Sequence, residues 1–178
     1  MKKGIIVILN GVSSSGKTSL ARVIQNRSPI PFYRLDIDDF ILMSPEKFND
    51  YENGDYSVQY AFASKFFYVV KLYSDLGFDL VVPCMIFKSS EALENYKSLL
   101  NGYPVLTVNI ICPEDELQRR ELARGNRKTG SSSKQLKLLE TNFDNGLTVN
   151  NYTNTNEECA DTIVRAILNM KRSGICVK

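Results

Sequence analysis

Short apolar runs alternate along this chain with longer segments in which apolar residues recur every three or four positions. A run of about four to eight residues with few polar interruptions is typical of a strand buried on both faces of a parallel sheet. Apolar residues at the longer spacing predict helices that bury one face. The runs that predict strands are 5–9, 80–87 and 105–112, with a weaker one at 147–153.

The segments between these runs predict helices. The first helix follows residue 18 and ends near Ser28, because the residue before a proline is disfavoured in a helix. The longest covers residues 57–76, and others are expected up to residue 100, over 114–124 and from residue 156 onward. Strands that alternate with helices in this way predict an α/β fold, a parallel sheet with helices on both faces.

One loop carries the clearest chemical pattern. Residues 11–18 read Gly-Val-Ser-Ser-Ser-Gly-Lys-Thr and follow a predicted strand and precede a predicted helix, as a phosphate-binding P-loop does. Glycines let the backbone turn closely around an anion, and Lys17 would reach the β- and γ-phosphates. Thr18 would offer its hydroxyl to Mg²⁺. The predicted nucleotide-binding residues are Gly11, Val12, Ser13, Ser14, Ser15, Gly16, Lys17, Thr18 and Ser19.

Size, charge and cysteine content narrow the class of protein. A chain of 178 residues is short for two domains of ordinary size, so we expect one domain over residues 1–178. Its net charge of +2 is too small to attract nucleic acid or an anionic membrane through an overall electrostatic field. The 4 cysteines are widely separated and there is no histidine, so we expect no zinc. Three of the cysteines lie among apolar residues, and we expect them to be buried, reduced thiols. No apolar run approaches the ~20 residues of a membrane span, so we expect a soluble cytoplasmic protein.

Three carboxylates end the second predicted strand, which we place at residues 32–40. They belong to Asp36, Asp38 and Asp39. Ligands of an open parallel sheet bind beyond the carboxyl ends of its strands, so we expect these acids to face the P-loop. The alternative is that one of them caps a following helix, because aspartate is a favoured N-cap residue.

The densest positive cluster occupies residues 119–130. Arg120 and Arg124 are four residues apart and therefore share a helix face. Basic residues in the last turn also complement the helix dipole, which is the alternative to a chemical role. We expect a lid over about residues 119–135 whose guanidinium groups bind phosphate oxygens.

Together these features are the parts of a phosphoryl-transfer site: a phosphate loop, a metal-binding hydroxyl, an acid to accept a proton, and arginines for developing charge. No feature of the sequence demands a macromolecular acceptor. Residues 43–56 mix aromatic and polar side chains, and form either the rim of a small-molecule pocket or plain surface. The sequence therefore predicts a small-molecule kinase.

Three blocks of the chain resemble the chloramphenicol phosphotransferases, small P-loop kinases that phosphorylate a hydroxyl group of an antibiotic. The blocks are residues 8–18, the acidic segment 36–41 leading to Pro45, and residues 120–127 continuing through Gly130 to Lys134 and Gln135. The resemblance implies ATP and Mg²⁺ as cofactors and a five-stranded parallel sheet of the nucleoside- and shikimate-kinase type. It implies Asp38 as the catalytic base, Lys17 as the phosphate lysine, and Arg120, Arg124 and Arg127 as the lid arginines.

The third predicted strand departs from that family. Pro83 and Cys84 stand where the family has acids that hold Mg²⁺ through water. We expect Asp36 to supply the missing carboxylate beside Thr18, in an arrangement similar to that of shikimate kinase. Asp36 lies two residues before Asp38 and so on the same side of an extended strand. The acceptor need not be chloramphenicol.

Two other functions fit the same motifs. A metabolic sugar, nucleoside or cofactor kinase of this fold would carry the same residues. A nucleotide-binding regulatory or RNA-associated module with slow ATPase activity would use the basic lid for a partner's phosphates, and Asp38 would be dispensable in it. We favour a small-molecule hydroxyl acceptor, with no nucleic-acid or membrane partner. The sequence leaves open whether the protein forms a homo-oligomer and whether it prefers ATP or GTP.

Overall fold

The computed structural model describes residues 2–43, 57–88, 90–124, 130–143 and 146–173, and they contain a five-stranded sheet. All neighbouring strands are parallel, in the order β2-β3-β1-β4-β5. The predicted α/β fold with a five-stranded parallel sheet is confirmed. The strands are β1 (Ile6–Asn10), β2 (Tyr33–Arg34), β3 (Leu80–Cys84), β4 (Val105–Ile111) and β5 (Leu147–Asn150).

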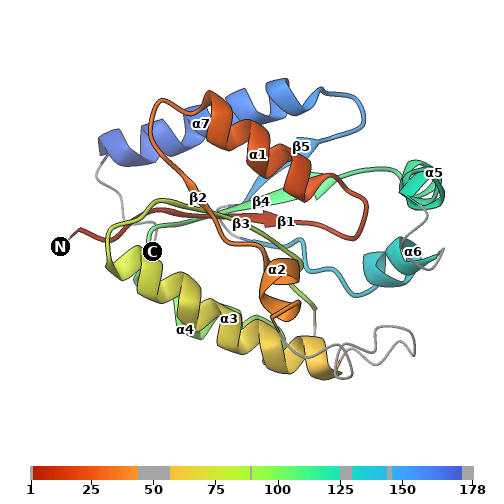
Figure 1. Ribbon diagram of the computed structural model, residues 1–178, viewed down its shortest axis with the longest axis horizontal. Helices are drawn as coiled ribbons and strands as arrows, with labels where there is room; N and C mark the ends of the chain where they lie inside the picture. The colour runs from red at the N-terminus through yellow and green to blue at the C-terminus, as the bar shows by residue number, and fades with distance from the viewer. Residues whose placement is uncertain (1, 44–56, 89, 125–129, 144–145, 174–178) are drawn as a thin grey trace.

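Helices cover both faces of the sheet (Figure 1). One face carries α1 (Lys17–Arg27) and α7 (Asn156–Ser173), and the other carries α2 (Ile37–Ile41), α3 (Ser57–Asp75) and α4 (Ser90–Leu100). Helices α5 (Glu114–Arg124) and α6 (Ser131–Leu136) lie beyond the carboxyl ends of the strands. None of the described helices is long and apolar enough to cross a lipid bilayer.

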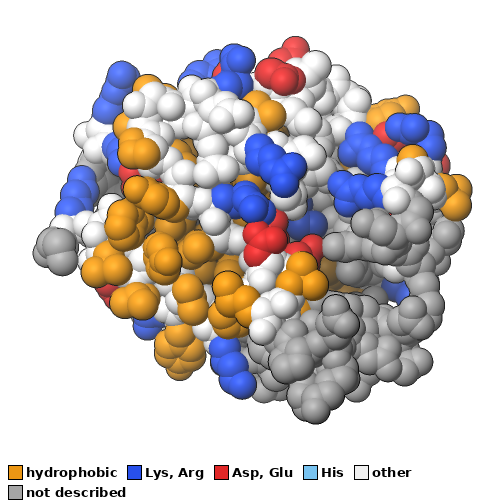
Figure 2. Space-filling view, in the orientation of Figure 1, with side chains coloured by type: hydrophobic (Ala, Val, Ile, Leu, Met, Phe, Trp, Pro, Cys, Tyr) orange, Lys and Arg blue, Asp and Glu red, His pale blue; other side chains and the backbone are white. Residues whose placement is uncertain are grey.

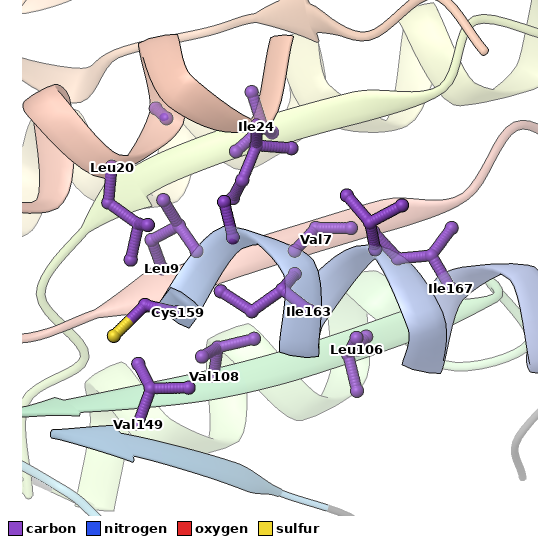
Figure 3. Packing of buried hydrophobic residues seen from close by; sticks show 14 of the residues in the cluster. Val7, Leu9, Leu20, Ile24, Leu106, Val108, Val149, Cys159, Ile163 and Ile167 are labelled. Carbon is purple, nitrogen blue, oxygen red and sulfur yellow. The ribbon is translucent and has the colours of Figure 1, made fainter. Parts of the chain in front are cut away.

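Strand β1 runs through the centre of the core. Its five residues are fully buried, and alternate side chains point to opposite faces of the sheet. Val7 and Leu9 pack among the residues of α1 and α7 (Figure 3), whereas Ile6 and Ile8 pack against α3 and α4. Strand β1, which leads into the P-loop, is therefore held on both faces by close packing.

The second strand is much shorter than the predicted 32–40, because only Tyr33–Arg34 pairs with the sheet. The carboxylate of Asp36 accepts a hydrogen bond from the backbone N–H of Asp38 at 3.1 Å and caps α2. The chain therefore turns into a helix at the point where we predicted continued strand. The prediction that Asp36 and Asp38 share one side of an extended strand was wrong.

Two further differences lie at the carboxyl edge of the sheet. The predicted strand 80–87 ends at Cys84, after which Ile86 donates its backbone N–H to the Asn10 side chain at 2.8 Å. Helix α6 was not predicted. Of the predicted rim 43–56, all but residue 43 lie outside the described residues. Cys84, Cys112 and Cys159 are buried free thiols, as expected.

Candidate active site

The P-loop connects β1 to α1 at the carboxyl edge of the sheet. Ser14 and Gly16 adopt left-handed backbone conformations, with φ of 62° and 91°. A residue with a Cβ rarely adopts the φ of Gly16, and a Cβ there would also crowd the Asn151 side chain, so the position favours glycine. The hydroxyls of Ser14 and Ser15 are buried, and neither has a hydrogen-bond partner in the part of the chain described. Buried polar atoms without partners are costly, so this loop fits a polar ligand such as a nucleotide phosphate.

Lys17 is the first residue of α1, and its side chain reaches back across the loop. Its Nζ donates a hydrogen bond to the carbonyl oxygen of Val12 at 2.7 Å. The side chain is half-buried. The predicted phosphate lysine therefore adds a positive charge to the concave loop, where backbone N–H groups already favour an anion.

Thr18 and Asp36 meet beside the P-loop. Thr18 Oγ1 donates to Asp36 Oδ2 at 3.1 Å, and Arg34 Nη1 donates to the same oxygen at 2.8 Å. Asp36 is only 6% exposed, and this burial is the main reason that the pKa of its carboxyl group is raised. A hydroxyl and a carboxylate are oxygen donors of the kind that Mg²⁺ prefers, so the pair fits the predicted metal.

Asp38 and Asp39 follow in the first turn of α2. The backbone N–H of Asp38 donates to Asp36 Oδ1, while its side chain is exposed. The Asp39 carboxylate pairs with Arg34 at 2.9 Å. Figure 2 shows red acidic side chains over the start of α2, next to a blue basic one. Asp38 is thus tied through its backbone to the Thr18–Asp36 pair, with its carboxylate on the surface.

The arginines of α5 lie on the other side of the P-loop. Arg120 is half-buried, and it donates from Nε to Glu116 Oε1 at 2.7 Å and from Nη2 to the carbonyl of Asn151 at 3.0 Å. Arg119 also pairs with Glu116. Hydrogen bonds from these two guanidinium groups lower the pKa of Glu116 to about 2. Arg120 is therefore held by an acid and by the turn that follows β5.

A pocket of about 340 Å³ opens between α5 and the P-loop. Its volume is within the range of small-molecule sites. The structure brings Arg120, Arg124 and Ser19 together here, but Arg127 lies outside the described residues. Figure 2 shows blue basic side chains gathered over α5. The pocket is lined by Ser14, Gly16, Ser19, Arg119, Arg120, Ala123, Arg124, Asn151 and Asn156.

Glu121 holds α5 and α6 together, a role that no motif in the sequence indicated. Its carboxylate accepts the backbone N–H groups of Gly130 at 3.0 Å and Ser132 at 2.7 Å, and it is only 1% exposed. The available signal was its position four residues after Leu117, on the buried face of α5, where an acid is unusual.

Two amide side chains brace the P-loop from other elements. Asn151, which follows β5, donates from Nδ2 to the carbonyl of Ser15 at 2.7 Å. Gln135 in α6 accepts the backbone N–H of Ser13 at 2.6 Å through Oε1. Gln135 belongs to a motif noted in the sequence, but no spacing rule indicated its partner. Helix α6 and the turn after β5 are therefore both hydrogen-bonded to the P-loop.

The family model of chloramphenicol phosphotransferase-like proteins matches residues 4–168 of this sequence. The chain belongs to the chloramphenicol phosphotransferase-like family. Family membership makes it a phosphotransferase of the small-molecule kinase class. A protein of Mycobacterium tuberculosis that carries the provisional name O-phosphotransferase is 28% identical over 153 residues, which span 73% of this chain and 67% of the relative.

Solved kinases share the fold of this phosphotransferase. The APS kinase CysC of Mycobacterium tuberculosis is 19% identical with a TM-score of 0.72, over 94% of this chain and 99% of that one. A gluconokinase of Sinorhizobium meliloti is 18% identical with a TM-score of 0.69, over 97% and 95% of the two chains. A shikimate kinase of Acinetobacter baumannii is 15% identical with a TM-score of 0.58, over 95% and 94%. At these identities the likeness shows the P-loop kinase fold.

In this phosphotransferase β3 ends with Cys84, in register with Asn10 of β1 and almost completely buried. Burial raises the pKa of its thiol to about 12, so the side chain is neutral. The charges of Lys17 and Asp36 both act on this thiol, which lies near them. A neutral thiol is a poor ligand for Mg²⁺. Among the described residues near this strand end, the carboxylate suited to the metal is that of Asp36.

Proposed function

We propose that this protein transfers the γ-phosphoryl group of ATP to a hydroxyl group of a small molecule. The observation that carries the proposal is the hydrogen-bonded series from Thr18 through Asp36 to Asp38, which begins one residue after Lys17. It places a hydroxyl group that can bind Mg²⁺, a buried carboxylate and an exposed carboxylate next to one another beside the phosphate loop. Family membership supports phosphoryl transfer as the reaction.

Each group has a distinct role in the proposed reaction. Lys17 and the loop N–H groups bind the phosphates, and the exposed Asp38 carboxylate orients the acceptor hydroxyl and takes its proton. Thr18 and Asp36 would hold Mg²⁺, which when bound neutralises charge on the phosphate oxygens. Arg120 and Arg124 donate to the oxygens of the transferring group, on which charge is spread in the transition state.

The pocket beside α5 supports a place for the nucleoside. It adjoins Gly16 and Ser19, so a molecule whose phosphates occupy the P-loop can extend into it. We propose that residues 119–135 act as the lid over this nucleotide, within a single kinase domain. Arg119 and Arg124 line the side of the pocket that α5 forms.

The acceptor is proposed at the level of its class. Chloramphenicol is one candidate, because the family is named for it. A metabolic sugar, nucleoside or cofactor is the second candidate. The neutral, buried Cys84 favours it, because the chain departs at this strand end from the acids of the family named for chloramphenicol.

The test is an assay of ADP release with ATP and Mg²⁺ over a panel of hydroxylated antibiotics and metabolites that includes chloramphenicol. We expect at least one compound to raise the rate of ADP release far above the rate without acceptor. A rate that stays the same with every compound, under conditions in which ATP binds, would favour the regulatory module with slow ATPase activity.

The change Asp36→Asn should raise the Mg²⁺ concentration for half-maximal rate by about 10- to 100-fold, the usual cost of losing a group that orients a metal's ligands. The asparagine keeps the shape but removes the negative charge beside Thr18. Because burial raises the pKa of Asp36, the wild-type requirement for Mg²⁺ should also rise as the pH falls toward that pKa. Asp39→Asn is the matched control, since Asp39 contacts Arg34 and leaves the Thr18 bond intact. An equal shift in both variants would contradict the assignment.

The change Arg124→Ala should lower kcat by about 10²- to 10³-fold, the usual effect of removing one preorganised donor to transition-state charge. The KM for ATP should change much less, because the donor acts mainly when charge develops. Arg120→Ala should lower kcat by a similar factor. The double variant should lose less transition-state stabilisation than the two single variants added together, because neighbouring donors share the same oxygens. A rise in KM with kcat unchanged would make Arg124 a ground-state contact.

A further inference from the structure

Gln135 lies beside Ser13 of the P-loop. Its Oε1 accepts the backbone N–H of Ser13 at 2.6 Å. Ser13 lies between Val12, whose carbonyl holds the Lys17 ammonium at 2.7 Å, and Ser14, whose φ is 62°. The amide group of Gln135 therefore lies within one residue of the groups that form the phosphate-binding concavity.

The bond from Ser13 fixes which way the amide is turned. A backbone N–H can donate only to the oxygen of a glutamine amide, so Nε2 with its two N–H donors occupies the other arm. Within the described ranges, Nε2 of Gln135 has no hydrogen-bond acceptor. The amide thus presents two oriented donors beside an anion-binding loop.

The element that carries Gln135 is held at both ends. Glu121 accepts two backbone N–H groups at the start of α6. After α6, Leu138 accepts from the backbone N–H of Lys88 at 2.7 Å, and Glu140 donates its own N–H to Ile86 at 2.8 Å. Apolar packing adds to this, because Leu136 and Leu139 form a cluster with Val12 of the P-loop. A donor on such a framework is preorganised and needs little rearrangement to bind a ligand.

We propose that Gln135 contacts the terminal phosphate of the bound nucleoside triphosphate, with Oε1 held by Ser13 and Nε2 donating to a γ-phosphate oxygen. This inference rests on the proposed function, because it assumes that a triphosphate occupies the P-loop. It makes the amide a sensor of the γ-phosphate: a diphosphate leaves its donors in water, and a triphosphate engages them.

The rival role for Gln135 is a brace that only holds the Ser13 N–H. The change Gln135→Glu separates the two, because a carboxylate still accepts from Ser13 at nearly the same size. It replaces both N–H donors by negative charge, which repels a phosphate oxygen. A brace would therefore tolerate glutamate, and a phosphate donor would not.

The experiment measures binding of ADP and of a non-hydrolysable ATP analogue by calorimetry, with Mg²⁺, in wild type and variants. We expect Gln135→Glu to weaken binding of the analogue by about 10- to 100-fold, the range for a lost hydrogen bond to a charged group. Binding of ADP should change less than about threefold, within the ordinary effect of a surface substitution. Gln118→Glu is the matched control for charge, because Gln118 is exposed on α5 and contacts Ser133.

A second variant, Gln135→Met, removes both donor and acceptor at similar volume and should also lose the preference for the analogue over ADP. Equal weakening of both nucleotides, or no weakening of either, would overturn the γ-phosphate contact while leaving the proposed kinase intact. Failure of the wild-type protein to bind either nucleotide would instead overturn the proposed function, and the role of Gln135 with it.

Discussion

Replacing Lys17 by alanine should reduce acceptor-dependent ADP release by at least about 10³-fold, toward the rate without enzyme. Its ammonium group crosses the P-loop to the carbonyl of Val12, where a terminal phosphate would add negative charge. Alanine removes that positive charge from a site that otherwise offers backbone N–H groups and serine hydroxyls. The measurement is the initial rate at saturating ATP and acceptor.

The fold should survive the change, because the Lys17 side chain is only half-buried and its bond to the Val12 carbonyl lies within the P-loop, not in the hydrophobic core. The thermal unfolding midpoint without ligand should therefore stay close to that of wild type. Stabilisation by ATP with Mg²⁺ should shrink. Lys97→Ala, at an exposed position on α4, is the control for loss of a lysine. Wild-type turnover in Lys17→Ala would remove the basis for a P-loop enzyme.

Replacing Asp38 by asparagine should lower kcat by about 10²- to 10⁴-fold, the usual contribution of general-base catalysis. A hydroxyl group is a poor nucleophile until its proton is accepted, and asparagine keeps the size of the side chain without that ability. The backbone N–H of residue 38 would still donate to Asp36, so α2 stays capped. Binding of ATP should scarcely change, because the carboxylate acts on the acceptor.

Variants of the neighbouring acids, Asp36 and Asp39, are the controls for this prediction. Asp39→Asn removes another exposed carboxylate from the same turn and should leave kcat within a few-fold of wild type. If Asp39→Asn or Asp36→Asn abolishes turnover while Asp38→Asn does not, the base is one of those neighbours. If none of the three matters, the transfer to a hydroxyl group has to be abandoned.

Most of the fold could be predicted because its signals are local. Strands β1, β3 and β4 are apolar runs, and the P-loop sits between a strand and a helix. The second strand was too long in the prediction because β-prone residues continue past Arg34, while the capping carboxylate of Asp36 starts a helix instead. Helix α6 reads Ser-Ser-Ser-Lys-Gln-Leu, which has no apolar period. It owes its place to Glu121, and no local pattern encodes that contact.

In the candidate site, too, local motifs could be recognised in the sequence and long-range contacts could not. Motifs indicated Lys17, Thr18 and Asp36, and the structure brings these residues together, although their roles stay predictions. The bond from Ser13 to Gln135 joins residues 122 positions apart, and the bond from Asn151 to Ser15 joins residues 136 apart. Such contacts depend on how the elements pack at the edge of the sheet, so spacing along one chain cannot reveal them.

Glu121 clamps α5 to α6 through its hydrogen bonds to Gly130 and Ser132. The three residues of this clamp lie in α5 and at the start of α6, on either side of the stretch between positions 124 and 130. The entropic cost of closing a loop grows only with the logarithm of its length, about 0.6 kcal/mol for each doubling. Insertions in that stretch would therefore cost the framework little. Relatives could therefore differ in the length of this stretch, apart from the lid arginine predicted at Arg127, while Gln135 and the P-loop keep their registration.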